Sequence, residues 1–369
     1  MTSSLLPQGF RDRMPPEAEA AAQAMTAALS AIGARGYRRV APPLAEYEEA
    51  LVGRLKSAGA RDLLRVLDPA SRRMLALRPD ITPQVGRIAG TRLAGAPRPL
   101  RLCYAGTVVR LAGGQLNPAR ELTQLGAELI GRDTVAAAAE IVAVAVDALQ
   151  AAGATGLSID LTLPDLVDLL AAGPLPLGPE KRERVRAILD AKDAGALVAA
   201  GAGGYLPLLE ATGPFADAVA RLRSLNFGTL FETRLAGLEA IVAPLGDEVR
   251  LTLDPTERHG FEYQSWFGFS LFADGHGAEL GRGGSYTVLH GDGREEPAVG
   301  VSLYPDPLFA APATGTRGRL FLPIGHRPAA AAAARADGWI TVAAIDDDCD
   351  PALLDCTHRL AEDGPQLLG

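Results

Sequence analysis

Several polar and charged side chains stand in segments where the sequence pattern predicts regular structure. A predicted return strand places Gln124 and Glu128 on one face, because strand side chains alternate between faces. Asp80 can cap a helix that begins near Thr82, and Arg110 ends an extended segment. Carboxylates bind cationic groups, and an arginine binds a carboxylate. Taken singly, the strand residues fit ordinary buried polar residues, but the five together favour a binding site.

A group of residues near the end of the chain has the side-chain types of a metal site without its spacing. Cys349, Cys356 and His358 fit no zinc pattern, and no fourth ligand is near them in the sequence. Three cysteines also cannot form a disulfide framework in a chain of this length. We therefore expect no metal and no cofactor.

The composition is that of a globular protein. The 369 residues include 36 Lys and Arg against 44 Asp and Glu, a net charge of −8, and 48% are hydrophobic. This balance argues against non-specific nucleic-acid binding, which depends on neutralising phosphates. The most apolar stretch, 136–152, carries Glu140 and Asp147 and predicts a buried helix rather than a membrane span. Because no secretory signal or anchor is visible, we expect a cytoplasmic protein of two or three domains.

Helical and extended segments alternate along the chain and predict an α+β protein. Two prolines before Glu17 predict the start of a helix. A hairpin is expected over 63–77, and a helix over 134–151 is apolar nearly all round, as expected beneath a sheet. Further extended segments are predicted at 37–41, 99–110, 121–128, 249–253, 260–272, 277–280 and 298–303, and further helices at 82–93, 179–191, 215–225 and 230–243.

The order of several short motifs resembles that of histidyl-tRNA synthetases. The motifs are Pro7-Gln8-Gly9-Phe10-Arg11-Asp12, Pro43-x-x-Glu46, Leu77-Arg78-Pro79-Asp80-Ile81-Thr82, the segment 104–131, and Gly283-Gly284-x-Tyr286 through Pro297-Ala298-Val299-Gly300. The resemblance spans most of residues 5–309 and implies an α+β fold of the class II aminoacyl-tRNA synthetase type, an antiparallel sheet flanked by helices. The implied domains are a core of residues 1–162 and 245–312, a helical insertion of residues 163–244, and a short C-terminal α/β unit of residues 318–369.

The resemblance also implies a pocket for free histidine. The synthetase residues that bind the ammonium fall on Asp80 and Thr82, and the arginine that faces the carboxylate falls on Arg110. The polar return strand of the family falls on Gln124 and Glu128, and one of the tyrosines that contact the imidazole ring falls on Tyr286. Gln264 stands where a second ring-contacting tyrosine is expected, and we expect Tyr263 beside it to compensate. Such a set suits a zwitterion, since each charge removed from water needs a partner.

The triphosphate side of the pocket departs from the synthetases. Ala112 replaces the acid of the Arg-x-Glu motif, and Pro118, Pro307 and His259 replace arginines. Each lost charge-assisted contact is worth about 1.5 to 3 kcal/mol. Adenylation depends on cations at the transferring phosphorus, so we expect amino-acid activation to be lost.

A synthetase-like chain with a retained histidine pocket and a broken ATP pocket resembles the family of ATP phosphoribosyltransferase regulatory subunits. The resemblance implies a non-catalytic subunit, not an enzyme, that a short-form catalytic subunit needs in the first step of L-histidine biosynthesis. It implies feedback inhibition by histidine and a dimer within a hetero-oligomer, expected to be a hetero-octamer. We expect neither a tRNA nor a membrane partner, because the C-terminal unit is shorter than an anticodon-binding domain and the chain is acidic.

Two other interpretations stay open at the level of the sequence. A divergent histidyl-tRNA synthetase would retain adenylation, which an ATP-dependent exchange assay detects. A synthetase paralogue that senses histidine without a transferase partner would not co-purify with a catalytic subunit.

Overall fold

The computed structural model describes residues 6–51, 63–113, 118–258, 264–310 and 318–368. Contacts divide the chain into two compact units, Met1–Ala311 and Pro312–Gly369. The larger unit contains every residue predicted for the pocket.

The larger unit is built on a nine-stranded sheet with the order β1-β5-β6-β12-β11-β10-β7-β9-β8. All pairs between β5 and β7 are antiparallel, whereas the outer pairs β1–β5 and β7–β9 are parallel. The predicted fold class is confirmed, with parallel pairs added near both edges of the sheet. The strands are β1 (Arg38–Arg39), β5 (Leu100–Val109), β6 (Glu121–Ile130), β7 (Ser158–Thr162), β8 (Gly213–Pro214), β9 (Arg250–Leu253), β10 (Gln264–Phe272), β11 (Gly281–Leu289) and β12 (Glu295–Leu303).

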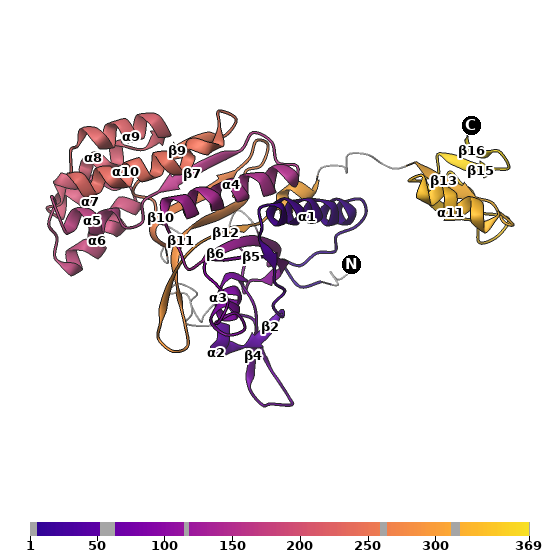
Figure 1. Ribbon diagram of the computed structural model, residues 1–369, viewed down its shortest axis with the longest axis horizontal. Helices are drawn as coiled ribbons and strands as arrows, with labels where there is room; N and C mark the ends of the chain where they lie inside the picture. The colour runs from indigo at the N-terminus through magenta and orange to yellow at the C-terminus, as the bar shows by residue number, and fades with distance from the viewer. Residues whose placement is uncertain (1–5, 52–62, 114–117, 259–263, 311–317, 369) are drawn as a thin grey trace. The chain divides into compact units, whose positions relative to one another are not determined.

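Helices α1 (Glu17–Ala34) and α4 (Val135–Ala151) pack together against one face of this sheet (Figure 1). α1 begins after two prolines and carries two acidic residues in its first turn, which favours the positive end of the helix dipole. The Thr134 hydroxyl caps α4 by accepting a backbone N–H at 3.3 Å. Buried residues of both helices, such as Ile32 and Ile141, belong to the main core of the unit.

The opposite face of the sheet carries α3 (Thr82–Gly90), whose side chains form a second core with residues of β5, β6 and β11. This helix ends at Gly90 rather than at Leu93, where the sequence pattern ended it. A three-stranded sheet leads into α3 (Figure 1) and confirms the predicted hairpin. Its strands are β2 (Ala45–Tyr47), β3 (Arg65–Leu67) and β4 (Met74–Leu77), and the short helix α2 (Glu48–Leu51) follows β2.

Between β7 and β9 the chain is mainly helical, and Figure 1 shows these helices gathered at one end of the sheet. The three helices predicted in this segment are present with slightly different ends. One strand interrupts the helices, since β8 pairs with β9 and extends the main sheet. The helices are α5 (Leu166–Ala171), α6 (Pro179–Asp190), α7 (Ala194–Ala199), η1 (Gly203–Tyr205), α8 (Leu206–Glu210), α9 (Phe215–Ser224), α10 (Thr229–Val242) and η2 (Ala243–Leu245).

The predicted strand at 277–280 is wrong. The strand at this place is β11, which begins at Gly281, and the residues before it form a loop. Glycines have low strand propensity, so the glycine-rich start of β11 concealed the strand in the sequence. The packing requires these glycines, because a Cβ at Gly283 would lie 2.6 Å from the ring of Phe269.

The smaller unit contains a four-stranded sheet with the order β14-β13-β15-β16. Leu320 and Leu322 of β13 form a small core with Ala331 and Ala334 of the helix. Among the described residues of both units, no helix is long and apolar enough to cross a membrane. The elements of this unit are β13 (Arg319–Leu322), α11 (Pro328–Ala336), β14 (Ile340–Ala343), β15 (His358–Ala361) and β16 (Gly364–Leu367).

Candidate functional site

A buried arginine holds the turn before α3 against the sheet. Arg78, which is 5% exposed, donates to the backbone carbonyls of Pro42 and Thr107 at 2.8 Å each. A guanidinium removed from water needs such acceptors, so these bonds fix the turn against β5. A Cβ at Gly106 would overlap the guanidinium, which explains the glycine. The turn therefore presents Asp80 to the sheet in a defined position.

Asp80 and Gln124 are joined directly. Asp80 Oδ1 accepts from the Thr82 N–H at 2.9 Å and from the Gln124 amide at 2.7 Å. The same amide nitrogen donates to the Ser302 hydroxyl at 2.8 Å, and the amide oxygen accepts from the Ile81 N–H at 2.9 Å. Because both ends of the amide are bonded, Gln124 links the start of α3 to β6 and β12.

Glu128 is the most deeply buried acid of the site, with 1% of its surface exposed. The hydroxyls of Tyr104 and Tyr286 donate to its two carboxyl oxygens at 3.1 and 2.6 Å, and the Thr82 hydroxyl lies 3.0 Å from that of Tyr104. Burial raises the pKa of Glu128 to about 8; the Tyr286 hydrogen bond opposes this rise, and the negative charge of Asp80 adds to it. At neutral pH the carboxyl is therefore largely protonated, and a cationic group beside it would favour ionisation.

Glycines make room for these side chains. Gly300 lies directly opposite Glu128 in the ladder between β6 and β12, and a Cβ there would overlap the carboxyl. A Cβ at Gly126 would overlap the Tyr104 hydroxyl in the same way. The resulting small cavity is lined by Thr82, Glu128, Arg282, Gly284, Tyr286, Gly300, Val301 and Ser302.

Arg110 lies close to the same site. Its guanidinium carbon is 5.3 Å from the centre of the Tyr304 ring. Burial raises the pKa of Tyr304 to about 12, the charge of Asp80 also raises it and the charge of Arg110 lowers it. Both charges therefore act on one hydroxyl. Arg110 makes no ion pair with any residue in the described parts of the chain, so its guanidinium can receive a ligand carboxylate.

The structure joins most of the predicted pocket residues in one hydrogen-bonded network. Arg110 lies beside this network, and Tyr263 and His259 fall outside the described residues. Tyr104 and Ser302 complete the network and were missed in the sequence. The register that brings these two residues together cannot be read from either segment. The predicted members that the network joins are Asp80, Thr82, Gln124, Glu128 and Tyr286.

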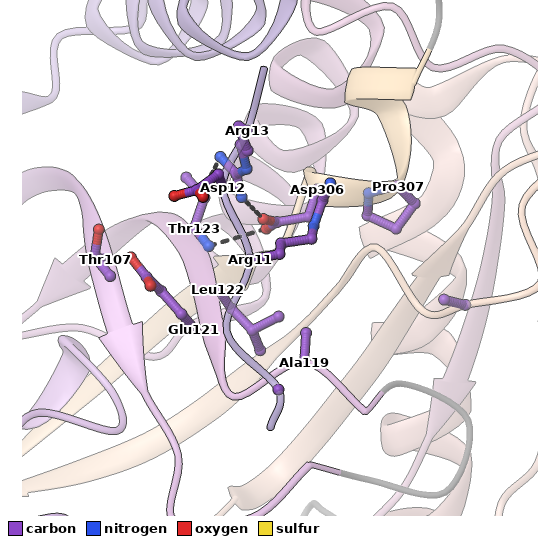
Figure 2. Close-up of a pocket in the computed structure, with 12 residues that line it drawn as sticks. Arg11, Asp12, Arg13, Thr107, Ala119, Glu121, Leu122, Thr123, Asp306 and Pro307 are labelled. Atoms are coloured by element: carbon purple, nitrogen blue, oxygen red, sulfur yellow. Dashed lines mark hydrogen bonds and ion pairs between the residues drawn. The ribbon is translucent and has the colours of Figure 1, made fainter. Parts of the chain in front are cut away.

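A separate cavity of about 640 Å³ lies beside the N-terminal segment (Figure 2). Arg13 pairs there with Asp306, which also accepts from the Thr123 N–H at 2.9 Å. Pro307, which replaces a synthetase arginine, forms part of the wall. Since Arg11 pairs with an acid of α1, both arginines of this wall already have acidic partners.

The described residues whose side chains could bind a metal ion do not form a metal site. No three His, Cys, Asp or Glu side chains among them are placed to hold a metal ion. Cys356 is buried and its thiol faces the carbonyl of Leu354, whereas the Cys349 thiol lies beside Asp346. The cysteines near the end of the chain therefore have ordinary local contacts.

The sheet order, the helix that lies over β5 and β6, and the polar network between them define a class II aminoacyl-tRNA synthetase-like protein. A family model described as Histidyl-tRNA synthetase matches residues 9–308. Curated relatives named ATP phosphoribosyltransferase regulatory subunit match nearly the whole chain. The protein from Paramagnetospirillum magneticum is 43% identical over 98% of this chain and 97% of its own length. The one from Gluconobacter oxydans is 39% identical over 97% and 95%.

The chain belongs to the family of ATP phosphoribosyltransferase regulatory subunits. It is therefore a non-catalytic subunit of an enzyme complex, and the names of its relatives confirm the prediction made from the sequence.

Solved structures agree with this assignment of the fold. A Bacillus halodurans protein described as an ATP phosphoribosyltransferase regulatory subunit/histidyl-tRNA synthetase superposes with a TM-score of 0.80 at 24% identity, over 96% of both chains. A chain of the ATP phosphoribosyl transferase (HisG:HisZ) complex from Thermotoga maritima gives 0.60 at 15% identity, over 79% of this chain and 98% of that chain. At these identities the similarity shows the fold.

Proposed function

We propose that this chain is required by a short-form ATP phosphoribosyltransferase catalytic subunit in the first step of L-histidine biosynthesis, and that histidine binds the site around Glu128 and lowers the activity of the complex. The names of the relatives support the regulatory role, and the Thermotoga maritima protein, described as a HisG:HisZ complex, supports a separate catalytic partner. The self-association that the sequence resemblance implies, a dimer within a hetero-octamer, is part of the same proposal.

The observation that carries the histidine part is the arrangement of charges in one polar site. The charges of Asp80 and Arg110 both act on the Tyr304 hydroxyl, and the Arg110 guanidinium lies 5.3 Å from the centre of the Tyr304 ring, so an acid and a cation share the neighbourhood of one residue. An α-amino acid presents an ammonium and a carboxylate, and each needs an opposite charge when it leaves water. The ring would then extend toward Glu128 and Tyr286, where the hydrogen-bonding groups lie.

Regulation requires that histidine bind two arrangements of the complex with different affinity. A coupling free energy of about 1 to 3 kcal/mol corresponds to roughly a 5- to 150-fold difference between the two affinities. Tight binding alone does not shift the equilibrium between the two arrangements, because a ligand with equal affinity for both leaves their populations unchanged.

The test is phosphoribosyl-ATP formation by the short catalytic subunit of the same organism, measured without this chain, with it, and with added histidine. We expect activity that depends on this chain and falls as histidine is added. No effect of the chain on the transferase would remove the proposal. Histidine-dependent ATP exchange by the chain alone would instead identify a working synthetase.

A substitution connects this assay to the site. Asp80→Asn keeps the size of the side chain but removes its charge, so we expect an active complex that histidine no longer inhibits at concentrations that inhibit the wild type. Asp274→Asn is the matched control, because Asp274 pairs with Arg250 on an exposed surface. Unchanged inhibition in the Asp80 variant would exclude this site as the place where histidine acts.

A further inference from the structure

Gln264 replaces the second ring-contacting tyrosine that the resemblance to synthetases implies. It begins β10 and lies directly opposite Tyr286 in the ladder between β10 and β11. Opposed residues of an antiparallel pair point to the same face, so Gln264 shares the face on which Tyr286 donates to Glu128. Its side chain is buried, with 8% of the residue exposed.

The orientation of the Gln264 amide follows from the hydrogen bond of its nitrogen. The amide nitrogen donates to the Gly283 carbonyl at 2.7 Å. A carbonyl oxygen can only accept, so the nitrogen must face it and the amide oxygen must point elsewhere. This oxygen is buried and has no hydrogen-bond partner among the described residues. A buried acceptor without a donor is uncommon in folded proteins and calls for an explanation.

The Gln264 amide oxygen lies against Gly284, a glycine that lines the cavity beside Glu128. A Cβ at Gly284 would overlap Gln264 Oε1, so the oxygen stands directly above this glycine. Gly284 also lines the small cavity together with Glu128 and Tyr286. Within the described residues, the oxygen is therefore an unpaired acceptor beside the cavity that Glu128 and Tyr286 line.

We infer that Gln264 Oε1 accepts a hydrogen bond from a ring N–H of the ligand and so makes a protonated ring nitrogen a requirement for binding. The inference rests on the proposed function, in which histidine occupies this site. A tyrosine hydroxyl, which the synthetases place here, can either donate or accept. The Gln264 oxygen can only accept, so it selects rings that donate at this point and rejects rings of the same size that do not.

Calorimetric titration of the full chain tests this requirement. The ligands are L-histidine and 3-(2-thienyl)-L-alanine, which has the same charged groups and a five-membered ring without N–H. We expect the wild type to prefer histidine by at least tenfold, because a site with a buried acceptor discriminates strongly against a ligand that leaves it unpaired. In Gln264→Met, which has a similar length and no amide, we expect histidine to bind about tenfold or more weakly and thienylalanine to bind no more weakly than before.

A conservative variant separates recognition from packing. Gln264→Glu retains an acceptor oxygen, and its protonated form can donate to the Gly283 carbonyl as the amide does. We expect this variant to keep the preference for histidine at pH values where the introduced carboxyl is protonated. Thermal unfolding of each variant verifies that the chain is folded before titration.

The possible results distinguish this inference from the proposed function. Wild-type binding of histidine with unchanged affinity and preference in Gln264→Met would overturn the inference and leave the proposed function standing. Absence of histidine binding to the wild type, alone or in the active complex, would overturn both. A measurement without any variant gives an independent check with the two ring N-methyl isomers of histidine. At least one isomer must lose binding, and binding of both isomers as tightly as histidine would contradict the inference.

Discussion

At the scale of single residues, Glu128 has the most unusual environment in the described site. Its carboxyl is almost fully buried, accepts from two tyrosines and has a pKa of about 8 because of burial. The unfolded chain ionises the same group near the usual value for glutamate, so the folded chain binds this proton more strongly. The contribution of Glu128 to the free energy of unfolding is therefore complete at pH values below the pKa of this group in the unfolded chain. It is lost as the pH rises toward 8.

Glu128→Gln should remove this loss. We expect the free energy of unfolding of the ligand-free wild type to fall between pH 5 and pH 8.5 by an amount on the order of a few kcal/mol from this group, and that of the variant to fall less. Urea unfolding at the two pH values measures both. Glu140→Gln is the matched control, because the hydrogen bond from Arg101 lowers the pKa of Glu140, so this group stays ionised in both folded and unfolded chains across the window and its removal should leave the pH dependence nearly unchanged. Equal pH dependence of Glu128→Gln and the wild type would contradict the assigned burial.

Arg110→Gln should weaken histidine binding without unfolding the chain. Arg110 has no acidic partner among the described residues, so its removal leaves no charge unpaired in the ligand-free protein. Loss of one charge-assisted contact of about 1.5 to 3 kcal/mol corresponds to a roughly 10- to 150-fold weaker affinity by calorimetry. Arg120→Gln is the control, because Arg120 bonds backbone carbonyls and stacks on Phe10. Similar losses in both variants would show a general effect of charge.

Some residues of the site could be predicted from the sequence and others could not, for a physical reason. The period of two along β6 correctly placed Gln124 and Glu128 on one face, because alternation is a local property. Ser302 of β12 joins the site because its hydroxyl accepts a hydrogen bond from Gln124 of β6. That contact depends on the register between the two strands. Register comes from the pairing of distant segments, which one segment of sequence does not contain.

At the scale of elements, the glycines of β6, β11 and β12 decide whether the site can form. They were visible in the sequence, but their low strand propensity led to the wrong start for β11. Their purpose appears only once Tyr104 and Glu128 are seen to occupy the space above Gly126 and Gly300. A glycine on one strand thus leaves the space that a buried polar side chain on the neighbouring strand occupies.

Gly300→Ala should displace the Glu128 carboxyl. The added methyl group would overlap that carboxyl, so we expect a loss of stability of about 1 to 3 kcal/mol and a loss of histidine binding. Gly33→Ala makes the same chemical change within α1, where nothing lies within 4 Å of the new Cβ. That control should be stabilised by about 0.5 to 1 kcal/mol. Thermal unfolding and calorimetry measure both effects, and unimpaired binding in the Gly300 variant would contradict the packing described.

At the scale of the whole molecule, the chain consists of two compact units, and the described site belongs to one of them. The finer division that the resemblance implies, with a helical insertion of residues 163–244 within the core, stays a prediction. The pairing of β8 with β9 was not predicted, because a strand of two residues has no periodicity to detect. Short strands of this kind are defined by the neighbour to which they bind.

A chain that ends at residue 311 should retain histidine binding. All described site residues lie in Met1–Ala311, so we expect the affinity of the truncated chain to stay within about threefold of the full chain. Calorimetry on the purified truncated chain measures this, and the same truncation with Glu128→Ala should show no binding. A loss of more than about tenfold in the truncated chain would indicate that the smaller unit contributes to the ligand site.

The wide spacing of the site along the chain also determines when it can exist during folding. The hydroxyls of Thr82 and Ser302 lie 3.3 Å apart but are separated by 220 positions. Long-range pairings of this kind close late, because the entropy of a long loop must be overcome first. During synthesis the site cannot be completed before β12 has left the ribosome. Histidine should therefore slow the unfolding of finished molecules and leave the rate at which new ones fold unchanged.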